Sequence, residues 1–433
     1  MVDTDKINYI VFEGGGGKGL AYLGALRALK DRFEPFLSGN QFGRIKGIGG
    51  ASAGALTAFL IACNFPFDSG DQTIVKAIRS SGFPKLLSIT EPGVQRFVNA
   101  KGFPIDNRKP RQTPTGQPPS IKKILKILKS ELIEMAEEKV GGLGKIAGLV
   151  LLLTSGRNTT DPVARLILNT ILKSDETVVN AFKCLAGEFG IFSGVEIRPI
   201  LQQWLKAAVS RSSKSAVTKA DLGGKAKLGT LTFDEFSDLT GSDLRITGTN
   251  ITTKRPFVFS KHNSPHFPVT EAVGISMTIP LVFKPVLVEG KIDQVEPGLW
   301  VDGGVLNNLP LHVFDSDHFG GAEFEKFTKL NPAVLALRLV PGNWPVGSGS
   351  APVRERGFFE YIADLGQTLL YPSEDGQIRS VEDFEQVIKV SHGSLSVLDF
   401  SPSAPGISDA ERAAEQSVRA QLAPSNAPGS LAD

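Results

Sequence analysis

The sequence predicts a three-layer α/β/α fold, in which a mostly parallel central sheet lies between helices. An apolar, strand-like run at residues 7–12 leads into a glycine run and then a segment of helical periodicity at 20–29. A second apolar run at 45–48 leads through a tight glycine turn into an apolar helix that ends near Cys63. Strand, tight loop and helix, repeated in this way, are typical of a parallel sheet with crossover helices.

The chain is predicted to form one α/β domain over residues 1–400, split by a helical insertion at about 68–218. This middle stretch has helical patterns with polar, proline-rich breaks. Strand-like runs return in the second half, at 244–252, 256–260, 280–288, 298–301 and 333–339.

The C-terminal segment, residues 401–433, is predicted to hold a last helix and a disordered tail. Ser408 and Glu411 have the spacing of a capping box in front of a helical pattern. The final residues are small and polar and lack the apolar side chains that a folded segment would bury.

Composition excludes several classes of protein. Among 433 residues, 47 basic and 45 acidic side chains leave a formal net charge of +2, and a nucleic-acid-binding protein needs a larger basic excess. The two cysteines, Cys63 and Cys184, are too few for a disulfide framework and too far apart for a metal site. We expect both to be small core residues, in keeping with a reducing compartment.

No targeting or membrane-spanning segment is predicted. The first residues lack a basic region followed by an apolar one, so they do not resemble a classical signal peptide. No window reaches the ~18 consecutive apolar residues of a transmembrane helix. A cytoplasmic location, with peripheral contact to membranes as an addition to it, is therefore the expectation.

The first chemical motif is Gly50-Ala51-Ser52-Ala53-Gly54, which lies between an apolar strand and an apolar helix. A serine on such a turn is held in a strained, exposed position at a helix N-terminus, and the flanking Gly50 and Gly54 let the helix pack on the strand. A plain glycine turn is the competing interpretation. The strand–turn–helix context favours Ser52 as a nucleophile.

The second motif is a glycine run, Gly14 to Gly19, at the end of the first strand. Glycines allow several backbone N–H groups to turn toward one point, which suits an anion or a developing oxyanion. The run also satisfies the dinucleotide-binding pattern G-x-G-x-x-G. That pattern calls for an acidic residue after the second strand, where this chain has the serine turn.

The third motif is Asp302-Gly303-Gly304, which follows a short apolar strand. The two glycines leave the Asp302 carboxylate with little steric cover. Alone, this sequence is more often an ordinary β-turn, so its significance depends on the other two motifs.

Together, and in this order, these motifs resemble the patatin-like phospholipase family. The matching stretches are EGGGGKGLAYLGAL, GASAG and VDGGVLNN, with a fourth at 274–283, GISMTIPLVF, that resembles the family's helix-and-strand segment. The resemblance runs from near residue 7 to near 310. One departure is Thr278, where alanine is common and little effect is expected; the other is the long insertion, which leaves the substrate open.

The resemblance implies the patatin-like fold and a catalytic dyad in which Asp302 takes the proton from Ser52. It also implies an oxyanion hole formed by the backbone N–H groups of Gly15, Gly16 and Gly17, with Lys18 as a nearby positive group. The implied activity is hydrolysis of a phospholipid or other acyl-ester lipid, of phospholipase A or lysophospholipase type, without calcium. No cofactor or metal ion is implied.

Several alternatives stay open at this stage. The chain order serine, aspartate, histidine would allow a triad completed by His312, His318 or His392, although the dyad is favoured. The same acyl-enzyme would serve an acyltransferase. A lipid-binding module without activity and a dinucleotide-dependent oxidoreductase are the more distant alternatives.

One segment, residues 120–140, is strongly amphipathic. Its apolar side chains fall on one helical face and four lysines lie on or beside the other: Lys122, Lys123, Lys126 and Lys129. A basic amphipathic helix can rest on an anionic lipid surface. Packing against the protein body is the favoured interpretation, because buried amphipathic helices are far more common.

Overall fold

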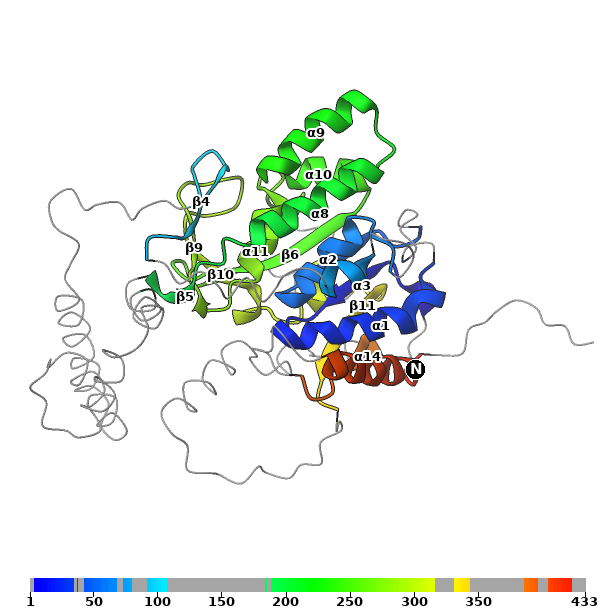
Figure 1. Cartoon of the computed structure of the whole chain (residues 1–433). Helices are drawn as coiled ribbons and strands as arrows, with labels where there is room; N and C mark the ends of the chain where they lie inside the picture. The colour runs from blue at the N-terminus through cyan, green and yellow to red at the C-terminus, as the bar shows by residue number, and fades with distance from the viewer. Residues whose placement is uncertain are drawn as a thin grey trace, which may run out of the picture.

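The computed structural model describes most of the α/β core and parts of the insertion (Figure 1). The described residues are 4–34, 37, 43–67, 73–79, 92–106, 184, 188–315, 331–342, 385–395 and 404–422. The amphipathic segment at 120–140 and His318 lie outside them. Within these residues, no helix has both the length and the apolar character needed to cross a bilayer.

Ten strands of the described residues form one sheet, in the order β12-β11-β1-β2-β6-β10-β9-β3-β4, with β7 paired to β6 as well. A separate parallel pair is formed by β5 and β8. The strands are β1 (Tyr9–Phe12), β2 (Gly47–Gly50), β3 (Arg96–Val98), β4 (Pro104–Asp106), β5 (Gly190–Phe192), β6 (Asp243–Asn250), β7 (Arg255–Phe259), β8 (Leu281–Phe283), β9 (Val286–Val288), β10 (Gly298–Asp302), β11 (Val334–Val340) and β12 (Val387–Ser391).

The sheet is parallel from β12 to β6 and largely antiparallel from β6 to β4. Strands β12, β11, β1, β2 and β6 run parallel to one another, as the alternation of strands and helices predicts. Strand β10 is antiparallel to both β6 and β9. The predicted α/β/α fold with a mostly parallel sheet is therefore confirmed, with an antiparallel extension beyond β6.

The described helices are α1 (Tyr22–Leu29), α2 (Ala53–Ala62), α3 (Ile74–Arg79), α8 (Ile197–Arg211), α9 (Ala216–Leu228), α10 (Phe233–Thr240), α11 (Val269–Ser276) and α14 (Ala404–Arg419). Short 3₁₀ helices are η1 (Thr4–Lys6), η2 (Gly16–Ala21), η3 (Lys30–Arg32), η7 (Gly303–Val305) and η8 (Leu311–Phe314). Helix α2 is buried around its whole circumference, since nine of its residues are buried, as expected for an almost entirely apolar helix.

The two faces of the sheet bury different clusters. Residues Ile10 and Phe12 of β1 face the larger core, which includes side chains of α1, α2, α8, α11 and α14. Residue Val11 faces the opposite way and packs with the segment 309–314, which contains η8. In Figure 1, α1 and α14 lie side by side although they come from opposite ends of the chain.

The register of β6 determines how two other strands approach each other. Residue Ile246 pairs with both Gly50 of β2 and Phe259 of β7, so β2 and β7 lie on opposite edges of β6. Residue Gly248 pairs with both Asp302 of β10 and Phe257 of β7, so β10 lies opposite β7 too. Strands β2 and β10 therefore share one edge of β6, and their C-terminal ends meet about two residues, or ~7 Å, apart.

Three short strands, β3, β4 and β5, lie in the range predicted to be a helical insertion. Each has only three residues, too few for a strand periodicity to be visible in the sequence. Two of them, β3 and β4, belong to the main sheet, since β3 pairs with β9. The predicted end of the insertion, near residue 218, falls within α9.

The capping box predicted at Ser408 and Glu411 is wrong. Helix α14 starts at Ala404, four residues earlier, so Ser408 lies inside the helix. The Glu411 side chain accepts a hydrogen bond from Arg27 of α1 at 3.4 Å instead of capping a helix end. Tertiary packing of α14 on α1 extends the helix beyond the local capping signal.

Candidate active site

Ser52 occupies a sharp turn between β2 and α2. Its backbone has φ 51° and ψ −122°, a left-handed conformation that is unfavourable for a residue with a side chain. The turn is tight because α2 packs directly on β1: a side chain at Gly54 would place its Cβ 2.3 Å from the Phe12 carbonyl oxygen. The predicted serine elbow is therefore present, with Ser52 at the N-terminus of a buried helix, but Ser52 is only 6% exposed and the prediction of an exposed position is wrong.

Ser52→Gly is expected to raise the free energy of unfolding by about 1 kcal/mol relative to Ser52→Ala. Glycine adopts a positive φ without strain, which removes a backbone strain of ~1–3 kcal/mol from the folded state. Part of this gain is lost because glycine also increases the conformational entropy of the unfolded chain. Thermal denaturation of the two variants provides the measurement, since both lack the hydroxyl group. Equal stability would mean that the turn at Ser52 is not strained.

Asp302 is the last residue of β10 and is 1% exposed. Its Oδ1 accepts a hydrogen bond of 2.7 Å from the Gly304 N–H, and its own N–H donates to the Thr278 carbonyl at 2.9 Å. Gly303 lies so close to β6 that a Cβ there would be 2.1 Å from the Thr247 hydroxyl oxygen. The Asp302-Gly303-Gly304 sequence is thus a constrained turn against the sheet.

Burial raises the pKa of Asp302 to about 7, from an ordinary value of 3.8. Hydrogen bonding from the Ser52 side chain and from the Gly304 amide lowers the pKa and partly offsets that effect. Asp302 Oδ2 is buried and forms no hydrogen bond of good geometry with the described residues. Hydrogen bonds between active-site side chains are often long or poorly aligned in the absence of substrate.

The glycine run lies against this pair. Gly14 donates its N–H to the Asn308 carbonyl at 3.0 Å, and a Cβ at Gly14 would lie 3.0 Å from the Ser52 Cβ. The Asn308 side chain donates to the buried Glu13 carboxylate at 3.2 Å, which joins the loop to the segment after Asp302. The chain after Asp302 therefore supports the loop that faces Ser52.

The predicted oxyanion loop continues into η2, whose first residues are Gly16 and Gly17. The first N–H groups of any helix have no partner within that helix, which leaves them available for an anion. Gly16 has φ 52°, a backbone conformation that favours glycine, and Gly15 precedes it as the N-cap residue. Ala53, the first residue of α2, presents an amide of the same kind next to Ser52.

Lys18 and His392 lie near each other at the end of the loop. Burial lowers the pKa of the Lys18 amine below its ordinary value. Burial and, to a smaller extent, the positive charge of Lys18 lower the pKa of His392 to about 4. The His392 ring is consequently neutral at physiological pH.

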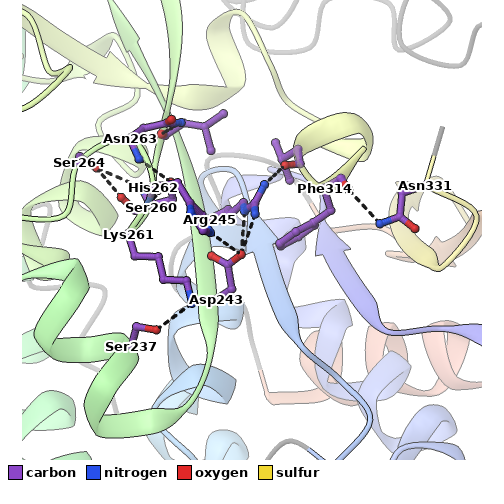
Figure 2. Close-up of polar contacts among 12 residues, drawn as sticks. Ser237, Asp243, Arg245, Ser260, Lys261, His262, Asn263, Ser264, Phe314 and Asn331 are labelled. Atoms are coloured by element: carbon purple, nitrogen blue, oxygen red, sulfur yellow. Dashed lines mark hydrogen bonds and ion pairs between the residues drawn. The ribbon is translucent and has the colours of Figure 1, made fainter. Parts of the chain in front are cut away.

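The other described histidines have partners away from Ser52. Figure 2 shows Arg245 and His262 converging on Asp243, the first residue of β6. Asp243 pairs with Gly47 at the start of β2, whereas Ser52 follows its end. His266 contacts Asp293 and His312 contacts Asp315.

Most of the predicted site residues are thus gathered where β1, β2 and β10 end, with Ser52 and Asp302 facing each other and the glycine loop beside them. Three contributors were not predicted as site residues, although all lie in the stretches that resemble the family. Ser276 Oγ accepts the Ser52 N–H at 2.9 Å, Thr278 binds the Asp302 amide, and Asn308 holds the loop. Ser276 and Thr278 lie in the matched stretch 274–283, but only their tertiary contacts distinguish them.

The α/β fold thus presents Ser52 on a strained strand–turn–helix elbow, opposite the buried Asp302. The model of one family, described as patatin-like phospholipase, matches residues 10–315. The chain belongs to the patatin-like phospholipase family.

Two viral proteins are similar to parts of the chain. The uncharacterized protein R571 of Acanthamoeba polyphaga mimivirus is 30% identical over 162 residues, which is 37% of this chain and 47% of that protein. The probable lipid hydrolase 463L of Invertebrate iridescent virus 6 is 28% identical over 83 residues, 19% of this chain and 26% of that protein. The chain therefore spans half or less of the length of these relatives.

Solved structures with similar folds come from bacterial proteins. The structure of VipD from Legionella pneumophila has 16% identity and a TM-score of 0.40, covering 96% of this chain and 66% of that one. Full-length ExoU of Pseudomonas aeruginosa, solved in complex with SpcU, has 16% identity and a TM-score of 0.36, covering 96% and 52%.

Proposed function

We propose that this chain is a lipid acyl hydrolase that cleaves carboxylic esters, with Ser52 as nucleophile and Asp302 as general base. The observation that carries the proposal is the Ser52 elbow at the end of β2, next to a buried carboxyl group at the end of β10. A carboxyl group with a pKa of about 7 is well matched to accepting a proton at neutral pH. Membership of the patatin-like phospholipase family supports a lipid ester as substrate.

In the first half of the reaction, Ser52 Oγ attacks the ester carbonyl carbon and its proton passes to Asp302. Negative charge develops on the former carbonyl oxygen. When the tetrahedral intermediate collapses, the bond to the alcohol oxygen breaks, and Asp302 returns the proton to the leaving alcohol. The acyl group remains as an ester of Ser52.

The backbone N–H groups of Gly15, Gly16 and Gly17 would bind the developing oxyanion, with the Lys18 ammonium nearby as a positive group. The loop is held in place before substrate arrives, through Gly14, Asn308 and Glu13. Donors that need no rearrangement stabilise the transition state most effectively, and the loss of one typically costs ~10²–10³ in rate.

In the second half, a water molecule gives a proton to Asp302 and its oxygen attacks the acyl carbon. The intermediate collapses, the bond to Ser52 Oγ breaks, and Asp302 returns the proton to the serine. A free fatty acid leaves, and both side chains recover their original states. Phospholipase A or lysophospholipase activity would follow from which ester enters the site.

Vesicles of phosphatidylcholine and phosphatidylglycerol, incubated with the purified chain, are expected to release free fatty acid, measured by mass spectrometry. In water labelled with ¹⁸O, one labelled oxygen should enter each fatty acid, because water is the acceptor. Addition of a calcium chelator is expected to leave the rate unchanged, since the proposed mechanism uses only protein groups.

In a parallel reaction, an alcohol is added to the vesicles. If the acyl group is transferred to this alcohol and no ¹⁸O-labelled fatty acid forms, the chain is an acyltransferase instead. A strong dependence on calcium would contradict the proposed chemistry. Ser52→Ala, assayed in the same vesicles, is the control for contaminating lipases.

A further inference from the structure

A short segment at the end of α11 binds the backbone of both proposed catalytic residues. Ser276, the last residue of this helix, accepts the Ser52 N–H on its side-chain oxygen at 2.9 Å. Two residues later, the Thr278 carbonyl accepts the Asp302 N–H, also at 2.9 Å. Residues 276–278 therefore bind the backbones of Ser52 and Asp302 at the point where β2 and β10 meet.

The Thr278 side chain holds residues 276–278 through two hydrogen bonds. Its hydroxyl donates to the Gly274 carbonyl at 2.8 Å, within the last turn of α11. The same hydroxyl oxygen accepts a hydrogen bond from Arg96 Nη2. Thr278 thus connects the end of a helix, the Asp302 amide and a guanidinium group.

Arg96 belongs to β3, which is separated from β10 by β9 in the order of the sheet. Its side chain is almost fully buried, with 2% of the residue exposed. Gly274 makes room for it, since a Cβ at that residue would lie 2.5 Å from Arg96 Nη1. A cation at this point also interacts favourably with the negative C-terminal end of α11.

A buried guanidinium is costly unless its surroundings are arranged around it, so an apolar side chain would be the simpler way to fill this space. The planar group instead packs against Gly274 and Gly194 and donates a hydrogen bond to the Thr278 hydroxyl. Such a rigid, directional contact restricts the position of the segment more than apolar packing would.

We propose that Arg96 and Thr278 are positioning residues for the ester hydrolysis, which hold residues 276–278 so that the Ser52 hydroxyl and the Asp302 carboxylate stay aligned. This inference rests on the function proposed above. Neither side chain touches the reacting atoms. Their contribution is geometric, and a misplacement of about 1 Å in an active site can cost ~10²-fold in rate.

Thr278→Val removes the hydroxyl at nearly constant volume, and kcat is expected to fall ~10- to 100-fold while KM changes less than about twofold. Thr278→Ser keeps the hydroxyl and is expected to stay within about threefold of the wild-type kcat. If Thr278→Val does not fold, Thr278→Ala, which leaves room for water beside the guanidinium, replaces it. Enzyme concentration is taken from fluorophosphonate titration of Ser52, so that unfolded protein does not enter kcat.

Thr270→Ala is the matched control. Thr270 is buried on the same helix, and its hydroxyl donates to the Gly229 carbonyl at 3.2 Å, away from Ser52 and Asp302. This variant is expected to lower the melting temperature and leave kcat unchanged.

Arg96→Lys keeps the charge and loses the planar group, and it should lower kcat as Thr278→Val does. An unchanged kcat in folded Thr278→Val, or equal losses in the valine and serine variants, would overturn the positioning role. Failure of the proposed function would look different, because wild-type protein would then neither label at Ser52 nor hydrolyse ester.

Discussion

Ser52→Ala is expected to lower ester hydrolysis at least ~10⁴-fold, because it removes the hydroxyl that is proposed to form the acyl-enzyme. Intact-mass analysis after treatment with a fluorophosphonate is the direct measurement. Wild-type protein should gain one adduct, and the alanine variant none. This reagent reports an activated serine without any assumption about the lipid that the enzyme uses.

The fold should survive this substitution. The Ser52 N–H, which binds Ser276, belongs to the backbone and remains in Ser52→Ala. Loss of the hydroxyl also leaves the helix contacts of α2 intact, because the Ser52 side chain does not cap that helix. Circular dichroism and the melting temperature should therefore match the wild type.

Ser210→Ala is the control, since Ser210 is an exposed serine on α8 whose hydroxyl binds only the Lys206 carbonyl among the described contacts. It should label and hydrolyse as wild type does. An adduct that persists in Ser52→Ala would place the reactive serine elsewhere. No adduct on folded wild-type protein would favour a lipid-binding module without activity.

Asp302→Asn is expected to lower kcat by ~10³-fold or more and, at the same time, to make the protein more stable above pH 7. The loss of rate follows from the loss of the proton acceptor next to Ser52. The gain in stability follows from burial, which raises the pKa of Asp302 from 3.8 to about 7. Asparagine keeps an oxygen for the Gly304 N–H and carries no charge to desolvate.

The pH dependence of that stability gain has a definite sign. Below pH 3.8 the carboxyl group is protonated in both the folded and the unfolded chain, so the charge costs nothing. Between pH 3.8 and about 7 the unfolded chain is ionised and the folded one is not, and the wild type loses stability as pH rises. Above pH 7 the loss is complete, with an upper limit of ~4 kcal/mol at 1.36 kcal/mol per pKa unit.

Urea denaturation at pH 4 and pH 8 measures this difference, and the rate of fluorophosphonate labelling from pH 5 to pH 9 measures the base. Labelling of the wild type should increase through about pH 7, as Asp302 loses its proton. Asp238→Asn, a change at an exposed carboxylate of α10, should alter neither result. A mild loss of rate in Asp302→Asn would point to a histidine as the base.

Local parts of this architecture could be predicted from the sequence because their signals lie within about ten residues. The apolar run at 7–12 followed by glycines, and the Ser52 turn between a strand and an apolar helix, are complete in themselves. Strand β12 and the three short strands of the insertion escaped prediction, because they are short and depend on partners far along the chain.

The start of α14 shows the same limit. A capping pattern at Ser408 is a local signal, and the packing of this helix on α1 outweighs it. The Thr278 hydroxyl, expected to have little effect, lies between Arg96 and the end of α11, and nothing in its neighbouring residues indicates that contact.

By itself, the sequence determined the local elements and the motifs, because a turn, a strand or a buried helix depends on residues that are adjacent in the chain. Only the tertiary structure decided that β2 and β10 meet end to end on one edge of β6, which brings Ser52 to Asp302. It also decided the burial that raises the pKa of Asp302. The contacts of residues 276–278 with the backbone N–H groups of Ser52 and Asp302 depend on the tertiary structure too. These properties arise from contacts between residues far apart in the sequence, up to the 224 positions between Ser52 and Ser276, which no local pattern encodes.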